Sequence, residues 1–176
     1  THLDGARVFV QSAHTNLEPA RYGELFDTVY TSLYKCFSAA SGAVLAGSKI
    51  FTTNLFHERR MFGGGLPSAW PFAAVALHFA DTFIDDYKTA IQNAEKLFSL
   101  IQKEEKFDII KFENGSHIVR LNIKNANLKR FSESLSKKNI HLNAPDENGF
   151  LLKINPSLNR ETPQSLADSF IESLKD

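Results

Sequence analysis

The sequence contains a single cysteine, Cys36, among its 176 residues. One thiol cannot form an intrachain disulfide or a multi-cysteine zinc site, and it is compatible with a reducing compartment. An excess of charge is also missing, because 20 lysines and arginines balance 20 aspartates and glutamates. This balance argues against a nucleic-acid partner and a polybasic membrane patch. It also gives little electrostatic protection against self-association.

Long hydrophobic runs and targeting segments are absent too. The longest apolar run, residues 70–80, falls short of the roughly 18 residues that span a bilayer, and His78 interrupts it. The first residues show neither the basic nor the apolar part of a signal peptide. We therefore expect a cytoplasmic protein that does not bind a membrane. None of the six histidines has metal-binding spacing, so no metal site is expected, and His78 is expected in the core.

What is present is a globular composition, with 43% hydrophobic and 23% charged residues. In the first half, helical and strand periodicities alternate, and the region ends in a glycine triplet. The pattern predicts the end of a strand over 1–3, a helix over 6–13, a buried strand over 26–32, a loop over 34–42, a strand over 43–46 and a helix over 48–59 that begins at Ser48.

The second half of the sequence has a different pattern of hydrophobic and polar residues. A long helical region is predicted from residue 67 or 68 to about 103, and two β-rich runs then surround Asn114-Gly115, which is a strong hairpin signal. The remaining pattern predicts a small α+β domain with an antiparallel sheet. Its expected elements are a helix over 128–137, strands over 140–143 and 150–154, and a last helix from 162 or 163 to 174.

Three separated segments carry residues suited to pyridoxal-phosphate (PLP) chemistry: HLDGAR at 2–7, SLYK at 32–35 and RRMFGGG at 59–65. Such chemistry needs a lysine amine that attaches to the cofactor and a carboxylate at its pyridine nitrogen. Asp4 and Lys35 follow predicted strands, and ligands of open α/β sheets bind outside the carboxyl ends of strands. A second interpretation, in which these residues have no catalytic role, stays open. Asp-Gly commonly marks a turn, and a lysine after a strand is commonly a solvated surface residue.

The order of these three segments resembles that of threonine aldolases and their β-eliminating lyase relatives. The resemblance covers residues 1 to about 103 and implies an α/β chain of the PLP-dependent transferase type, the aspartate aminotransferase fold (fold type I). Residues 1–82 would be the C-terminal part of the large PLP-binding domain. Residues 83–104 would be a long connecting helix, and 105–176 the small α+β C-terminal domain.

The resemblance also implies a role for individual residues at a cofactor site. Lys35 would attach to pyridoxal 5'-phosphate, and Asp4 would pair with its pyridine nitrogen; both would be catalytic. His2 would orient Asp4 at the cofactor. Arg60, or its neighbour Arg59, would lie near the phosphate or at a subunit boundary.

Substrate binding is implied for Arg7 and, less directly, for Lys153. Arg7 would receive the carboxylate of an amino-acid substrate. Threonine aldolases supply a second arginine from a C-terminal strand, and Lys153 is the closest match here, with Arg160 a few residues further on. The chain also has Tyr34-Lys35-Cys36 where the family typically reads Ser-Lys-Gly, and residues 66–68 read Leu-Pro-Ser instead of Met-Arg-Gln.

The resemblance therefore leads us to expect a threonine-aldolase-type lyase that cleaves a β-hydroxy amino acid to glycine and an aldehyde. Two alternatives stay open: a β-eliminating lyase that gives pyruvate and ammonia, and a degenerate, cofactor-free domain that acts in assembly. The family also uses an N-terminal half that carries the phosphate-binding loop. We expect this chain to be a C-terminal portion that acts with that missing half in a homodimer or homotetramer.

Overall fold

The computed structural model describes residues 1–113, 115 and 117–175, and the chain forms two compact units. The first unit contains residues 1–85 and the second contains residues 86–176. The long helix α7 (Phe83–Ile101) begins at the end of the first unit, and most of its length belongs to the second. The two units are described separately below.

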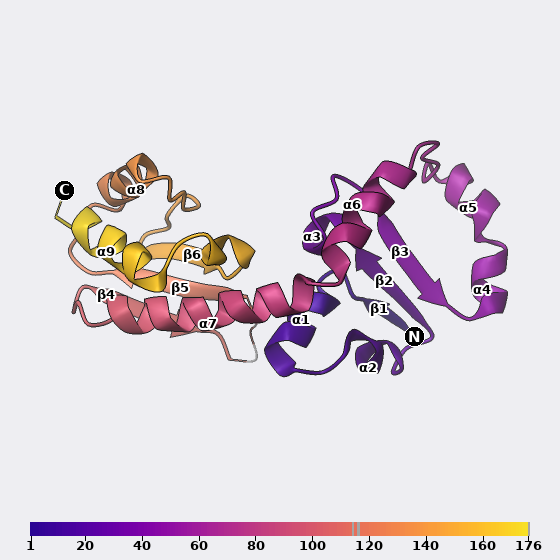
Figure 1. Cartoon of the computed structure of the whole chain (residues 1–176), viewed down its shortest axis with the longest axis horizontal. Helices are drawn as coiled ribbons and strands as arrows, with labels where there is room; N and C mark the ends of the chain where they lie inside the picture. The colour runs from indigo at the N-terminus through magenta and orange to yellow at the C-terminus, as the bar shows by residue number, and fades with distance from the viewer. Residues whose placement is uncertain (114, 116, 176) are drawn as a thin grey trace. The chain divides into compact units, whose positions relative to one another are not determined.

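The first unit is built on a mixed three-stranded sheet of order β1-β2-β3 (Figure 1). The short strand β1 (His2–Asp4) is parallel to β2 (Thr28–Ser32), and β3 (Ala43–Gly47) pairs antiparallel with the other edge of β2. The register places Asp4 beside Tyr30. Because β1 and β2 are parallel, their carboxyl ends lie at the same edge of the sheet.

Aromatic side chains from three parts of the sequence form the core of this unit. The Phe37 ring lies 4.7 Å from the Phe9 ring and 5.4 Å from the Phe83 ring, both in edge-on geometry. Such contacts between rings stabilise the fold in addition to the free energy gained by burying their apolar surface. The helices of the unit are α1 (Val8–Thr15), α2 (Pro19–Gly23), α3 (Leu33–Cys36), α4 (Lys49–Thr53), α5 (Leu55–Met61) and α6 (Trp70–Ala80).

Two predictions for this unit were wrong in detail. The expected loop over 34–42 begins with the one-turn helix α3, which is closed by a hydrogen bond from the Phe37 N–H to the Leu33 carbonyl. The expected helix over 48–59 is two helices that meet at Asn54. Ser48 does cap α4, accepting the Phe51 N–H at 3.2 Å. The break follows Thr52 and Thr53, whose hydroxyls bond to helix carbonyls, a competition that weakens a helix interior.

The predicted helical region over 67–103 is also interrupted. It consists of α6 and α7, which are separated at Asp81 and Thr82, both of which have low helix propensity. His78, which we expected in the core, is exposed on α6. Only Ala76 is buried among the residues of α6, all of which the structure describes.

The second unit contains an antiparallel sheet of order β4-β5-β6, which confirms the predicted α+β arrangement. Its strands are β4 (Phe107–Lys111), β5 (Ile118–Ile123) and β6 (Gly149–Lys153). The two strands expected around Asn114-Gly115 pair with each other as predicted. Asn114 itself lies outside the described residues, so the predicted turn is not described.

Phenylalanine dominates the core of this unit. The Phe131 ring lies 6.0 Å from Phe107, 5.8 Å from Phe150 and 5.9 Å from Phe170, and it is 2% exposed. The helix α8 (Leu128–Lys137) has the bounds predicted from the sequence. The other elements are the 3-10 helix η1 (Pro156–Asn159) and α9 (Pro163–Ser173).

The strand predicted over 140–143 does not form in the structure, which has no strand between α8 and β6. Asn139 has a left-handed backbone conformation with φ of 61°, and the Ile140 N–H donates to the Leu135 carbonyl at 3.0 Å. These contacts close the end of α8 and set the direction in which the chain leaves it. The segment that follows borders a cavity instead of pairing with β6.

Candidate active site at the ends of the parallel strands

The turn that follows β1 holds Asp4 at the carboxyl edge of the sheet. The Ala6 N–H donates to Asp4 Oδ1 at 3.2 Å, so the side chain caps its own turn, as aspartate commonly does. Oδ2 has no hydrogen-bond partner among the described residues, and the Asp4 side chain is exposed. One carboxylate oxygen is therefore available to a ligand.

This turn lies directly against β2. A Cβ placed on Gly5 would lie 2.8 Å from the Tyr30 carbonyl oxygen, so only glycine allows the approach. The Thr31 hydroxyl donates to the Gly5 carbonyl at 3.5 Å, and the Cys36 thiol points to the Ala6 carbonyl at 3.8 Å. The turn with Asp4 and the segment with Lys35 are thus held together.

Lys35 lies in α3, which follows β2 without an intervening residue. Its side chain is exposed, and its ammonium nitrogen lies 5.4 Å from the centre of the Tyr34 ring. This contact is a cation–π interaction at an exposed site. The described residues of the chain leave the amine in contact with solvent. The contact between the Lys35 amine and the Tyr34 ring was not predicted, although the two residues are adjacent in the sequence.

Cys36 follows Lys35 in α3, and its thiol contacts the turn at the Ala6 carbonyl. The side chain is buried, and this burial raises the pKa of the thiol to about 11, while the nearby charges of Arg7 and Lys35 act in the opposite direction. The thiol is therefore protonated at neutral pH and is not a nucleophile. Both cations therefore lie near enough to the thiol to influence its pKa.

The remaining predicted site residues are not brought to this edge by any described contact. His2 bonds through Nδ1 to the Thr28 hydroxyl at 2.8 Å, at the amino-terminal ends of the two strands. Arg60 lies on α5, with its guanidinium 5.6 Å from the Phe56 ring centre. Lys153 belongs to β6 of the second unit. The roles predicted for these three residues stay predictions.

No group of three or more histidine, cysteine or acidic side chains is placed to hold a metal ion among the described residues. None of the described helices is both long and apolar enough to cross a bilayer.

The solved structures that resemble this chain establish its fold. A protein of Exiguobacterium sp. 255-15, provisionally assigned as an aromatic amino acid beta-eliminating lyase/threonine aldolase, superposes with a TM-score of 0.77 and 22% identity. The match covers 99% of this chain and 51% of that one. Leishmania major threonine aldolase superposes with a TM-score of 0.62 at 16% identity, over 99% of this chain and 50% of its own. The chain therefore has the α/β architecture of fold type I PLP-dependent enzymes.

It belongs to the beta-eliminating lyase family, whose family model matches residues 1–125. The low-specificity L-threonine aldolase of Candida albicans is 30% identical over 102 residues, which are 58% of this chain and 27% of that enzyme. The Escherichia coli K12 enzyme of the same name is 24% identical over 147 residues, 81% of this chain and 42% of its own. The chain thus aligns with less than half of these curated relatives and about half of the solved ones.

The residues at the strand ends fit the cofactor that this family uses. Asp4 offers a free carboxylate oxygen and Lys35 an exposed primary amine, on two adjacent strand ends. These are the two groups that a pyridine nitrogen and an aldehyde require. PLP supplies the chemistry of the family, and Lys35 and Asp4 are the residues that would hold it here.

Proposed function

We propose that this chain is part of a PLP-dependent lyase of the threonine aldolase type, which cleaves a β-hydroxy amino acid into glycine and an aldehyde. The observation that carries the proposal is the turn with Asp4, which lies against β2 and α3 next to Lys35. The relatives named as threonine aldolases support the choice of reaction.

Each side chain of the site has a task in this proposal. Asp4 Oδ2 holds a proton at the pyridine nitrogen, because a carboxylate favours the charged form of a nearby base. Lys35 would hold the cofactor through its amine, and once released it could move a proton at the reacting carbon. Arg7 receives the substrate carboxylate through its planar fork. Bound PLP supplies the sink for the electron pair released at the substrate Cα.

The products separate this reaction from its nearest alternative. The full protein that contains this chain, supplied with PLP and L-threonine or L-allo-threonine, is expected to release glycine and acetaldehyde in equal amounts. With L-serine or an aromatic amino acid, pyruvate and ammonia would instead identify a β-eliminating lyase, an alternative that the family match favours. The products of either reaction are measured by chromatography after derivatisation. If neither reaction occurs in protein supplied with PLP, the lyase proposal is wrong, and a protein that also retains no PLP supports the cofactor-free assembly domain.

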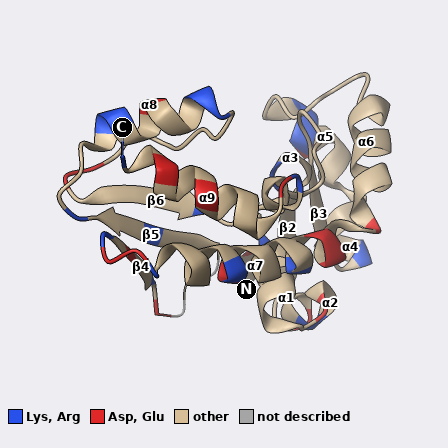
Figure 2. Ribbon diagram, turned by 60° about the vertical axis from the view of Figure 1, so that its left-hand side comes forward, with Lys and Arg blue, Asp and Glu red and all other residues tan. Residues whose placement is uncertain are grey.

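We also propose that the protein assembles, because the first unit exposes a large apolar surface. Helix α6 contains no Lys, Arg, Asp or Glu and is tan throughout in Figure 2, and a helix that is apolar on all sides is normally buried. The exposed residues of this region include Ile50 at 86%, Phe62 at 83%, Trp70 at 74% and Leu77 at 71%. Single exposed apolar residues are normal, but together with an uncharged helix these side chains favour a surface that is covered in the full protein, by its N-terminal half or by a second copy.

The assembly is expected to depend on this surface in a measurable way. In sedimentation velocity, the full protein is expected at the mass of a dimer or tetramer at micromolar concentration. The change Leu77→Glu places a charge on the apolar surface of α6 and is expected to shift most of the protein to smaller species. The matched change Lys103→Glu, at an exposed position of the second unit, is expected to leave the mass unchanged. A monomeric wild type would disprove the homo-oligomer.

A further inference from the structure

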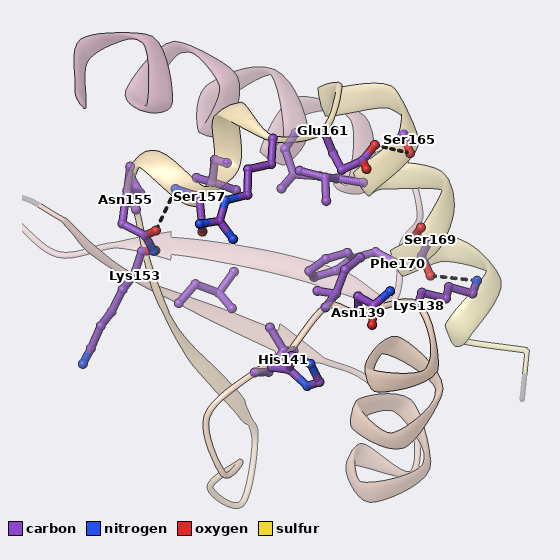
Figure 3. A pocket seen from close by; sticks show the side chains of 18 of the residues that line it. Lys138, Asn139, His141, Lys153, Asn155, Ser157, Glu161, Ser165, Ser169 and Phe170 are labelled. Carbon is purple, nitrogen blue, oxygen red and sulfur yellow. Dashed lines mark hydrogen bonds between the residues drawn. The ribbon is translucent and has the colours of Figure 1, made fainter. Parts of the chain in front are cut away.

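The second unit contains a cavity to which the proposed function assigns no task, although Lys153 and Arg160, named above as the nearest matches to the family's second arginine, line it. Its volume is about 580 Å³, within the range of roughly 300–1,000 Å³ typical of small-molecule sites. Its walls come from the segment 138–143, from β6 with Asn155, from η1 with Arg160, and from α9 (Figure 3). All of its lining residues belong to the second unit.

One part of the cavity wall is apolar and rigid. Phe98, Ile154, Leu166 and Phe170 line it, and each of them is at least nine-tenths buried. Phe170 is also in ring contact with Phe131 in the core. A wall fixed by core packing keeps its shape, so a ligand that binds there loses little free energy to ordering the site.

The charged groups at the cavity are predominantly cationic. Lys138, Lys153 and Arg160 line it, against one carboxylate, that of Glu161. Lys138 is already neutralised by an ion pair with Glu172 at 2.7 Å, and Glu161 accepts a hydrogen bond from Ser165. Figure 3 shows the Lys153 side chain extending away from the other labelled side chains. Arg160 is thus the cation that remains for a ligand.

The Arg160 side chain has no hydrogen bond or ion pair within the described part of the chain. A guanidinium presents a planar fork that matches the two oxygens of a carboxylate. The hydroxyl of Ser157 and the imidazole of His141 also line the cavity and offer further polar contacts. An unpaired fork beside an apolar, aromatic wall is complementary to an amphipathic anion.

We propose that this cavity is a binding site for a small monocarboxylate that carries an aromatic or bulky apolar group. Arg160 binds the carboxylate, and the wall formed by Phe98, Ile154, Leu166 and Phe170 receives the apolar part. All residues that line the site belong to the second unit, whereas Lys35 and Asp4 belong to the first. The proposal is tested by binding alone and does not rest on the lyase reaction.

Matched probes of one shape and different charge test this proposal. 3-Phenylpropanoate, 3-phenylpropan-1-ol and 3-phenylpropan-1-amine are titrated into the PLP-free protein, and binding is followed by saturation-transfer NMR and by the amide shifts of Ile154 and Phe170. The carboxylate is expected to bind saturably, the alcohol at least about tenfold more weakly because the charged hydrogen bonds are lost, and the amine not at all. Equal binding of the three probes, or no saturable binding of the carboxylate, overturns the proposal.

Three variants locate the site. Arg160→Gln is expected to weaken carboxylate binding at least about tenfold, whereas Arg130→Gln, on the exposed outer surface of α8, keeps wild-type affinity. Ser157→Trp fills the cavity from an exposed position and is expected to abolish binding, which gives an independent test if Arg160→Gln unfolds. Lys35→Ala is expected to bind the carboxylate normally. Unchanged affinity in both Arg160→Gln and Ser157→Trp, or loss of affinity in Lys35→Ala, overturns the assignment.

Discussion

Replacing Lys35 with alanine is expected to abolish the covalent attachment of PLP to this protein. Borohydride reduction converts the reversible bond between a lysine amine and the cofactor aldehyde into a stable one. The wild-type full protein, incubated with PLP and reduced, is expected to carry one cofactor-sized mass addition on the peptide that contains residue 35. Lys35→Ala lacks the only amine that the site at the strand ends presents among the described residues, so this addition is expected to disappear completely.

Lys49→Ala provides the matched control for this experiment. Lys49 is an exposed lysine of the same unit at the start of α4, and the adduct on residue 35 is expected to persist when it is removed. An addition that remains in Lys35→Ala would place the cofactor on another amine. A wild type without any addition would refute PLP attachment and favour the assembly domain.

A Gly149→Ala change is expected to destabilise the second unit severely. A Cβ at this position would lie 1.9 Å from the Leu121 carbonyl oxygen and 2.9 Å from the Asn122 Cα, both of them backbone atoms of β5. Because backbone in a paired strand cannot move away as a side chain does, β6 must shift or detach. Overpacking costs about 1–3 kcal/mol in a core that can adjust, and we expect a loss of about 3 kcal/mol or more here.

Hydrogen exchange of the β5 and β6 amides measures this effect within the unit. The amide of Ile123, which donates to the Asn148 carbonyl at 3.1 Å, and the amide of Ile154, which donates to the His117 carbonyl at 2.7 Å, are expected to exchange much faster in the variant. Gly23→Ala is the control, because its Cβ would meet only the Val29 Cγ2 atom, at 3.6 Å. That change is expected to be neutral or slightly stabilising, by up to about 1 kcal/mol. Normal protection of β6 in Gly149→Ala would show that the strand tolerates the added methyl group.

The sequence predicted which residues belong to the candidate site, but only part of how the structure arranges them. The order of three separated segments, which hold Asp4 with Arg7, Lys35, and Arg60 with the glycine triplet, indicated the family. The parallel pairing of β1 and β2 places Asp4 and the start of α3 at one edge. The one-turn helix around Lys35 was not predicted, because four residues are too few for a periodicity to appear. His2 and Arg60 share the motifs of the site residues, yet their observed contacts are with Thr28 and Phe56.

Elements whose stability is local were determined by the sequence itself. Helix α8 has the predicted bounds because Asn127 caps its amino terminus, accepting the N–H groups of Lys129 and Arg130 at 3.1 Å, and because its apolar positions recur at helical spacing. The hairpin strands β4 and β5 also follow directly from alternating runs of residues. Each helix or strand pattern lies within about a dozen consecutive residues, and local sequence patterns predict structure over that length.

Tertiary structure alone decided the features that join distant residues. Segment 140–143 has a strand-like sequence, but the contacts that end α8 leave it outside the sheet, and a cavity lies there instead. Gly5 and Gly149 read as ordinary turn glycines, yet backbone atoms 25 or more residues away in sequence make them irreplaceable. The reason is physical: a local pattern fixes which side chains avoid water, whereas close packing between segments fixes which backbones touch.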